Sequence, residues 1–210
     1  HEIKNPLTPI LLSAQRLRNI FLDKLDSKDS AIINKTTKTI IDQVASMDSM
    51  VSAFANYANT PEIQKVSTSL NTLVNKAVSL YDTQAGVRID VDLSGDLPKL
   101  KLDKDAISRL LINLIKNCIE SKKKKTKLNI VIKSQIVKDD GIVRLTIVDN
   151  GNGFPEDILD QVFEPYITTK SKGSGLGLAI VQNIVEQHDG QIYASNIEPH
   201  GARVTIEFSI

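Results

Sequence analysis

The sequence predicts a two-part α+β chain, in which an N-terminal helical hairpin precedes an α/β sandwich with a largely antiparallel sheet. Over the first sixty residues, apolar positions step alternately by four and three, which is typical of packed helices. Beyond about residue 61, strand-like alternating runs are mixed with helical segments. The last two strand-like runs follow one another directly, as in an antiparallel pair.

Composition limits the classes of function. The chain has 210 residues, of which 41% are hydrophobic, so it can bury a core. The 26 basic and 25 acidic residues give a net charge of +1, which provides no global field for nucleic acid or an anionic membrane. Cys118 has no partner for an internal disulfide, and its apolar neighbours predict a buried thiol. Because the chain begins with His1 and not Met, we expect it to be a segment of a longer protein, and no run approaches the roughly 18 apolar residues of a membrane helix.

The helical hairpin is predicted over residues 1–60, with a polar turn at residues 23–30. Its first helix carries the apolar seam Ile3, Leu7, Ile10, Ala14, Leu17 and Phe21, and its second helix the seam Ile33, Thr37, Ile40, Val44, Met47, Val51, Phe54 and Ala58. Further apolar residues beside the seams widen the stripe beyond what one partner helix can cover. This width favours a dimeric four-helix bundle, and the alternative is an intramolecular hairpin docked on the second domain.

The second domain is predicted over residues 61–210. Its helical segments are expected at about residues 70–81, 104–121 and 175–188. Its extended segments are expected at residues 63–67, 87–93, 128–137, 142–149, 191–195 and 203–210.

The opening stretch HEIKNPLTPI places His1 beside Glu2 on a segment that contains two prolines. Pro6 and Pro9 have no backbone N–H for the carbonyls of residues 2 and 5, so a helix that runs through them bends just after His1. Alternatively, Asn5 caps a helix that starts at Pro6.

Two amides lie four residues apart on a mostly apolar predicted helix. Asn113 and Asn117 share one face of the segment ISRLLINLIKNCIES. They could simply bond a neighbouring loop, but an Asn oxygen is also a hard ligand suited to Mg²⁺, which takes its other ligands from water and phosphates.

In the strand VRLTIVDNGNGFP, Asp149 is in phase with three buried apolar residues. The Asn150-Gly151 pair alone is also typical of a surface hairpin turn. However, the residues after Gly153 indicate a short helix and not a returning strand. An inward carboxylate beside Gly151 and Gly153 fits an acceptor for an exocyclic amine such as that of adenine.

The stretch TTKSKGSGLGLAIVQNIV places Gly173, Gly175 and Gly177 just before an apolar-periodic helix. Free backbone N–H groups and the positive end of that helix would suit a phosphate, with donors and charge supplied by Thr168, Thr169 and Lys170. The stretch satisfies neither the Rossmann nor the P-loop pattern, and a flexible glycine loop that caps a helix remains the alternative.

In this order, the stretches HEIKNPLTP, NLIKN, DNGNG, FEPYITTK and GSGLGL resemble the H, N, G1, F and G2 boxes of sensor histidine kinases. The resemblance spans almost the entire chain, and SAQRLRN and FANYANTPE make it most similar to the NtrY-like nitrogen-regulation group. It implies that the sandwich is a GHKL (Bergerat) ATPase domain, that residues 1–60 form the dimerisation and phosphotransfer hairpin, and that residues 61–210 form the catalytic ATP-binding domain.

The resemblance also implies roles for single residues. His1 would be the phosphoacceptor, Glu2 would hold its other ring nitrogen, and Asn5 would orient water in a phosphatase reaction. Asn117 would bind Mg²⁺, Asn113 would lie on the nucleotide face, Asp149 would bind the adenine amine and Lys170 would reach the phosphates. The other residues expected to bind nucleotide are Gly151, Gly153, Thr168, Thr169, Gly173, Gly175, Leu176 and Gly177.

ATP and Mg²⁺ are the implied cofactors, and a second copy of the chain and a response-regulator receiver domain are the implied partners. The implied location is the cytoplasmic part of an inner-membrane bacterial sensor kinase.

Two departures stand out: Glu120 replaces a common basic residue, and His188-Asp189-Gly190 replaces His-Gly-Gly. We expect His188 to favour the helix C-terminus and Gly190 to end the helix. The alternatives are a GHKL ATPase of another kind, such as a chaperone or topoisomerase-like gate, which lacks an H box, and an inactive or phosphatase-only dimeric scaffold.

Overall fold

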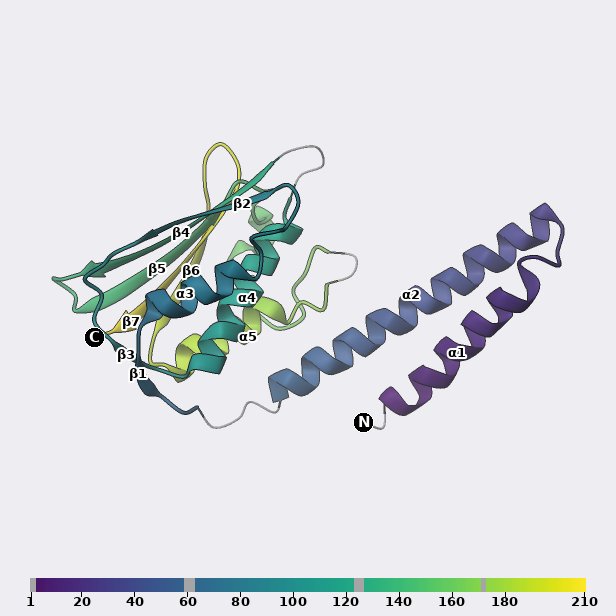
Figure 1. The fold of residues 1–210 in the computed structure, drawn as a ribbon, viewed down its shortest axis with the longest axis horizontal. Coiled ribbons are helices and arrows are strands. Elements are labelled where there is room, and N and C mark those ends of the chain that lie inside the picture. Colours follow the sequence, from purple (N-terminus) through teal and green to yellow (C-terminus); the bar gives the residue numbers. More distant parts are fainter. Residues whose placement is uncertain (1–2, 59–62, 123–126, 171–172) are drawn as a thin grey trace. The chain divides into compact units, whose positions relative to one another are not determined.

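The computed structural model describes residues 3–58, 63–122, 127–170 and 173–210. The chain divides into two compact units (Figure 1). The helical unit contains residues 1–60 and 169–174, and the α/β unit contains residues 61–168 and 175–210. None of the described helices is long and apolar enough to cross a membrane.

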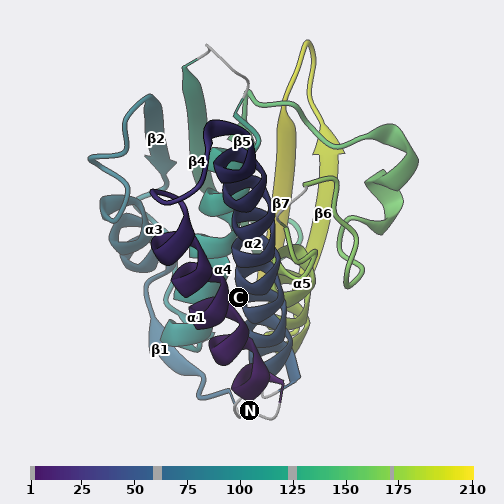
Figure 2. The ribbon, with the colours of Figure 1, turned by 90° about the vertical axis from the view of Figure 1, so that its right-hand side faces the viewer.

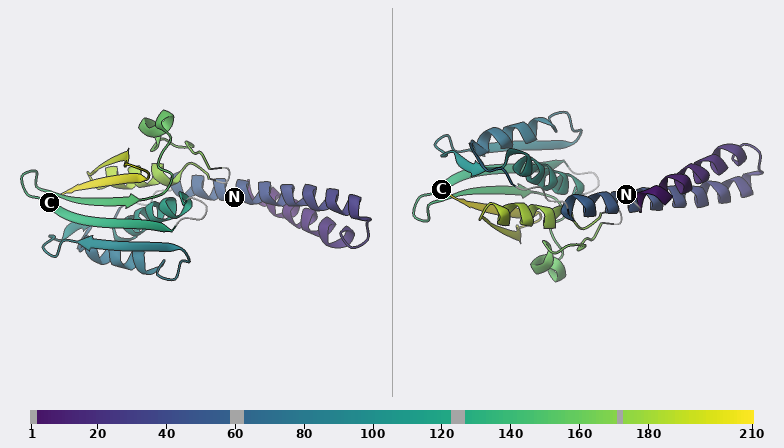
Figure 3. Two further views of the ribbon diagram at one scale, coloured as in Figure 1. Left: turned by 90° about the horizontal axis from the view of Figure 1, so that it is seen from above. Right: turned by 90° about the horizontal axis from the view of Figure 1, so that it is seen from below.

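The helical unit is a hairpin of α1 (Lys4–Phe21) and α2 (Ser27–Ala58), which lie side by side in both views of Figure 3. Leu7 and Ala14 of α1 and Val44 of α2 are buried between them. Thr37 is also buried, and its hydroxyl donates to the carbonyl of Ile33 at 2.7 Å, so its polar group is satisfied within the helix.

Two expectations about this hairpin are wrong in detail. The alternative in which Asn5 caps a helix that starts at Pro6 is wrong, because α1 already begins at Lys4 and Asn5 is its second residue. Pro6 is therefore in the first turn, where a missing N–H leaves no intrahelical bond unmade, while Pro9 lies inside the helix. The predicted turn at residues 23–30 is too long, because the Asp26 carboxylate accepts from the N–H groups of residues 28 and 29 and thereby starts α2 at Ser27.

The α/β unit contains a five-stranded mixed sheet with the strand order β2-β4-β5-β7-β6 (Figure 2). β2 (Val87–Leu93) runs parallel to β4 (Leu128–Val137). The remaining pairs are antiparallel and join β4, β5 (Ile142–Asp149), β7 (Ala202–Ser209) and β6 (Gln191–Asn196). The predicted, largely antiparallel sheet is therefore confirmed.

Three helices cover one face of this sheet in Figure 1: α3 (Leu70–Ser79), α4 (Lys104–Glu120) and α5 (Gly177–Gln187). Their apolar faces and the inward residues of the sheet form one core, in which Ile107, Leu111 and Ile130 are fully buried. Cys118 is buried in this core, as its neighbours predict.

A second, two-stranded sheet lies at the start of the α/β unit. β1 (Val66–Thr68) pairs antiparallel with β3 (Leu100–Leu102), a strand that the sequence pattern did not reveal. Asp103 follows β3 directly and caps α4, because its carboxylate accepts from the N–H groups of Asp105 and Ala106 at 3.0 and 2.9 Å. The short helix expected after Gly153 is a 3₁₀ helix, η1 (Glu156–Gln161).

Candidate functional site

The amides of α4 face the first residue of α5. A β-carbon on Gly177 would lie 3.7 Å from the Oδ1 and Nδ2 atoms of Asn117 and 3.8 Å from Oδ1 of Asn113. Asn113 also donates to the carbonyl of Arg109, one turn earlier in its own helix, at 3.0 Å. Two amide side chains thus lie beside a helix N-terminus, where unpaired N–H groups and the helix dipole favour an anion.

Asp149 ends β5 and is 4% exposed, in phase with the buried Val143, Leu145 and Ile147. Its Oδ1 atom accepts from the backbone N–H of Gly151 at 2.7 Å and lies 3.0 Å from the hydroxyl of Ser121. The hairpin-turn alternative is wrong for this segment. The bonds recorded among the described residues engage Oδ1, which leaves Oδ2 as the oxygen that can accept from a ligand.

Ser121 is a site residue that the sequence pattern did not reveal. It is the C-cap of α4, and its N–H donates to the carbonyl of Asn117 at 3.0 Å. A β-carbon on Gly151 would lie 2.0 Å from the Ser121 hydroxyl, so only glycine permits this contact. The available signal was its spacing: Ser121 follows Asn117 by four residues, on the same helical face.

The loop after Asp149 is held by Asn196 at the end of β6. The side chain of Asn196 accepts from the N–H of Phe154 at 2.7 Å and donates to its carbonyl at 2.8 Å. A β-carbon on Gly153 would lie 2.8 Å from Oδ1 of Asn196. The Gly151–Gly153 loop therefore has a fixed conformation next to the Asp149 carboxylate.

The glycine stretch before α5 packs closely on the loop that contains Tyr166. Gly175 has a φ of +67°, its carbonyl accepts from the N–H of Tyr166 at 3.0 Å, and a β-carbon at Gly175 would lie 2.5 Å from the backbone of Tyr166. Tyr166 itself has a φ of +70°, which is unusual for a residue other than glycine. The next residue, Leu176, is buried and anchors the start of α5 in the α/β unit.

The remaining predicted residues, Thr168, Thr169, Lys170 and Gly173, lie between Tyr166 and Gly175 in the chain. Thr168 is exposed on the α/β unit. Thr169, Lys170 and Gly173 belong to the segment Thr169–Ser174, which is grouped with the helical unit, and the N–H of Gly173 donates to the carbonyl of Lys170 at 3.1 Å.

Of the residues predicted to act in phosphotransfer, Asn5 lies exposed in the first turn of α1. His1 and Glu2 lie outside the described residues.

The donor set fits a magnesium nucleotide. Among the described residues there is no cluster of three His, Cys, Asp or Glu side chains that could hold a metal ion on its own. Mg²⁺ bound to a nucleotide does not need one, because phosphates and water supply most of its ligands and a hard oxygen such as that of Asn117 can complete them. Asp149 offers a carboxylate oxygen for an amine, and the N-terminus of α5 offers a phosphate site.

The sequence comparisons identify the family. The family described as histidine kinase-, DNA gyrase B- and HSP90-like ATPase matches residues 102–210. A protein of Rickettsia bellii named putative sensor histidine kinase NtrY-like is 34% identical over the whole chain, which covers 34% of that relative. The nitrogen regulation protein NtrY of Azorhizobium caulinodans is also 34% identical over the whole chain, which covers 27% of it. The chain therefore spans about a third or less of the length of these relatives.

Solved structures share the fold. Full-length ShkA in complex with AMPPNP superimposes with a TM-score of 0.71 at 23% identity, over 99% of this chain and 44% of that chain. The histidine kinase ThkA in complex with the response regulator protein TrrA gives a TM-score of 0.70 at 24% identity, over 99% of this chain and 58% of that chain. The chain thus belongs to the family of histidine kinase-, DNA gyrase B- and HSP90-like ATPases, and its similarity to sensor histidine kinases extends along its whole length.

Proposed function

We propose that this chain is the catalytic part of a sensor histidine kinase, which transfers the γ-phosphoryl group of ATP to His1 and then to an aspartate of a response regulator. The observation that carries the proposal is the Asp149 carboxylate, held at the end of β5 by Ser121 and Gly151 and linked through Ser121 to Asn117. The whole-length similarity to sensor histidine kinases supports the same function.

In the proposed nucleotide complex, Oδ2 of Asp149 accepts from the adenine amine. Asn117 holds Mg²⁺ with Asn113 beside it, and the N–H groups at the start of α5 bind phosphate oxygens near Gly177. The glycine stretch that includes Gly173 and Gly175 covers the phosphates, and Lys170 neutralises part of their charge. When bound with the nucleotide, Mg²⁺ would reduce the negative charge that repels a nucleophile.

For the transfer itself, a ring nitrogen of His1 attacks the γ-phosphorus while the bond to the β-phosphate oxygen breaks. Glu2 accepts a hydrogen bond from the other ring nitrogen and so keeps the attacking nitrogen unprotonated. Because phosphoryl transfer needs little covalent chemistry from the protein, positioning and charge neutralisation supply most of the rate.

We further propose that the chain acts as a homodimer through the helical unit. Seam residues of both helices remain exposed in the single chain: Ile10, Leu17, Ile40 and Met47 are 46, 45, 37 and 48% exposed. A second hairpin would cover these residues and complete a four-helix bundle.

Asn5, four residues after His1, is the proposed orienting residue for water in dephosphorylation of the regulator. The same proposal includes a cytoplasmic location for this segment and a membrane anchor elsewhere in the parent protein.

The deciding experiment is incubation of the chain with γ-labelled ATP and Mg²⁺, beside the His1→Gln variant. A label that resists alkali, is lost in acid and disappears in the variant is the expected result. ATP binding without any such label would contradict the kinase proposal and favour the phosphatase-only scaffold or an ATPase of another kind.

A further inference from the structure

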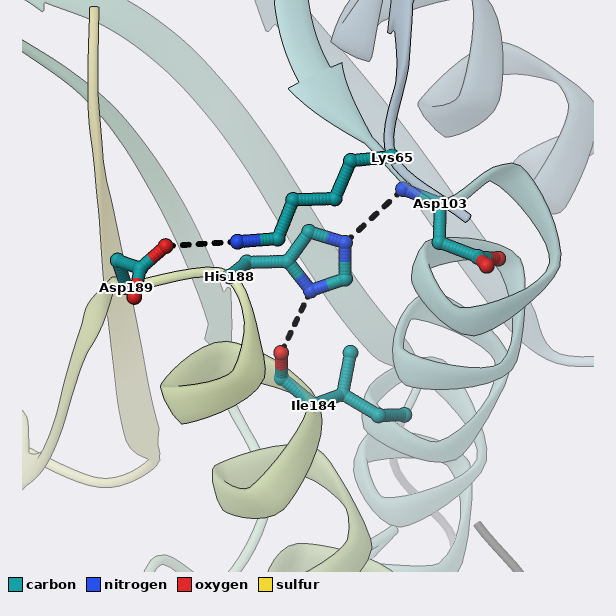
Figure 4. Close-up of polar contacts among 5 residues, drawn as sticks. All are labelled: Lys65, Asp103, Ile184, His188 and Asp189. Carbon is teal, nitrogen blue, oxygen red and sulfur yellow. Dashed lines mark hydrogen bonds and ion pairs between the residues drawn. The ribbon is translucent and has the colours of Figure 1, made fainter. Parts of the chain in front are cut away.

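A polar cluster lies at the ends of α4 and α5 that are remote from Asn117 and Gly177, and it contains His188, Asp103, Asp189 and Lys65 (Figure 4). His188 is the C-cap of α5 and is 7% exposed, with its ring edge-on to Phe208. Its Nδ1 atom lies 2.7 Å from the carbonyl oxygen of Ile184, and its Nε2 atom lies 2.9 Å from the backbone nitrogen of Asp103.

These partners fix the form of the ring. A carbonyl oxygen can only accept a hydrogen bond, so Nδ1 of His188 carries the proton. The backbone N–H of Asp103 can only donate, so Nε2 carries the lone pair. The neutral imidazole therefore connects the last turn of α5 to the first residue of α4.

Asp103 extends this connection to the segment that follows the helical unit. Its Oδ1 atom caps α4, and its Oδ2 atom accepts from the backbone N–H of Gln64 at 2.7 Å. Burial raises the pKa of the Asp103 carboxyl, but hydrogen bonds from the backbones of Ala106, Gln64 and Asp105 outweigh burial and hold the pKa below its usual range. The carboxylate is thus ionised when it holds Gln64.

Asp189 binds Lys65, the residue that follows Gln64. It follows His188 with a φ of +57°, in a turn where the N–H of Gly190 donates to the carbonyl of Val185 at 3.0 Å. Its carboxylate pairs with the ammonium of Lys65 at 2.6 Å, which lowers the pKa of Asp189. A glycine at this position would have no carboxylate to pair with Lys65.

Helices α4 and α5 meet at both ends, since Asp103 contacts His188 at one end and Asn117 lies beside Gly177 at the other. A shift of one helix along the other would change both contacts together. Gln64 and Lys65 lie six and seven residues after the end of α2 at Ala58, so the cluster holds the start of the α/β unit.

We propose that Asp103, His188 and Asp189 form a clamp that holds the linker residues Gln64 and Lys65, and that this clamp couples the linker to the nucleotide site at the opposite ends of α4 and α5. A nucleotide that contacts both Asn117 and the N-terminus of α5 fixes the position of the two helices relative to each other, and so keeps the clamp closed. If bound nucleotide shifts the equilibrium of the clamp toward its closed state by a given factor, thermodynamic linkage requires that the open state binds nucleotide more weakly than the closed state by the same factor. His188 and Asp103 are then positioning residues, through which the conformation of the linker changes the affinity of the nucleotide site.

The test is amide hydrogen exchange of the whole chain, with and without the non-hydrolysable analogue AMPPNP and Mg²⁺. In the wild type, the nucleotide is expected to slow exchange at the amides of Gln64 and Asp103. His188→Leu removes the acceptor and is expected to speed exchange at both amides about tenfold, whereas His188→Gln, whose Oε1 can replace Nε2, restores most of the protection. Amides within β4 and β5 serve as the internal reference, because general destabilisation would change them too.

Lys65 is exposed, and Lys65→Met keeps the length of its side chain while it removes the charge. This variant therefore tests the clamp even where His188→Leu does not fold. It is expected to speed exchange at Gln64 and to weaken AMPPNP binding, measured by calorimetry, to the extent that the open clamp becomes populated. Lys101→Met, an exposed residue of β3 opposite Ser67, is the matched control and should change neither quantity. Unchanged exchange at Gln64 in Lys65→Met, or exchange at Gln64 that AMPPNP does not slow in the wild type, would overturn the proposal.

Both measurements need only nucleotide binding, so they do not depend on the proposed kinase activity. Only the effect of the clamp on phosphoryl transfer rests on the proposed function. If the wild type binds AMPPNP but forms no phosphohistidine, the proposed function fails while the clamp stands. If it forms phosphohistidine, Lys65→Met at saturating ATP is expected to lower the rate about twofold to threefold, because a longer free linker reduces the effective concentration of the reacting groups. An unchanged rate would then show that the clamp has no part in transfer.

Discussion

The hydroxyl of Ser121 lies 3.0 Å from Oδ1 of Asp149 and thereby joins the end of α4 to the end of β5. The same oxygen accepts from the N–H of Gly151 at 2.7 Å. The single proton of the Ser121 hydroxyl is shared between this oxygen and the carbonyl of Cys118, which lies at 2.8 Å. The N–H of Gly151 and the shared hydroxyl together orient the carboxylate, and its second oxygen is presented to a ligand. A residue outside the sequence motifs thus sets the orientation of the residue expected to select adenine.

Replacement of Ser121 by alanine is expected to weaken ATP binding about fivefold, because one hydrogen bond that orients the carboxylate contributes about 1 kcal/mol. Calorimetric titration with AMPPNP and Mg²⁺ measures the effect. Ser108→Ala is the matched control, since the hydroxyls of Ser108 and Ser121 both donate to a carbonyl of α4, but Ser108 lies more than three turns before Ser121. Equal losses of affinity in both variants would contradict the role assigned to Ser121.

Asp149→Asn should be far more harmful than Ser121→Ala. If the amide oxygen takes the place of Oδ1 and keeps its two donors, the amide nitrogen faces the adenine amine, and two donors then oppose each other. We expect a loss of about 100-fold in ATP affinity, which corresponds to about 3 kcal/mol for an unpaired polar group. Competition between ATP and inosine triphosphate distinguishes this cause from unfolding, because only the ATP preference depends on the exocyclic amine.

Gly175→Ala is expected to destabilise the loop around Tyr166. The new methyl group would lie 2.5 Å from backbone and would have to adopt a φ of +67°, so the loop must move. The cost should be about 1–3 kcal/mol in the free energy of unfolding, measured by denaturant titration, with a matching loss of nucleotide affinity. Gly95→Ala is the control, because a β-carbon added there would have no atom within 4 Å and the φ of Gly95 is not in the left-handed region.

The sequence pattern predicted the strands well because alternation is a local signal. The bounds predicted for β2, β4 and β5 match the structure, and Asp149 is buried at the position that its phase indicated. β3 was missed because three residues are too few to show a period, and its existence depends on pairing with β1 across more than thirty residues.

The contacts that complete the site could not be predicted because they are tertiary. Ser121 meets Asp149 across 28 residues, and His188 meets Asp103 across 85 residues. Sequence spacing places a residue on a face of its own element but says nothing about the element opposite. His188 was correctly predicted at the end of its helix, yet the hydrogen bond that its ring accepts from Asp103, the N-cap of α4, depends on how α4 and α5 pack.

The free energy of unfolding at acid pH should depend on Asp103. Because its folded pKa is held below the ordinary value of about 3.9, its contribution to stability is fully present above that value and is lost as pH falls through the lower, folded value. Asp103→Asn, which keeps a capping side chain, should therefore lower the free energy of unfolding at pH 7 and approach the wild type near pH 2. Denaturant titrations between pH 2 and pH 7 test this, and parallel curves for the two proteins would contradict it.

The exposed seam of the helical unit provides a test of the dimer. Leu17 is 45% exposed on α1, in line with the buried Leu7 and Ala14, so a second hairpin is expected to bury it. In a symmetric dimer, Leu17→Glu places two charges in the interface, each at a cost of about 2 kcal/mol or more in lost burial alone. Sedimentation equilibrium should give a dimer for the wild type and a monomer for the variant at micromolar concentration. Arg16→Glu changes an exposed residue at the adjacent position and controls for added negative charge. A wild-type chain that sediments as a monomer would contradict the dimer, and the exposed seam would then need another partner.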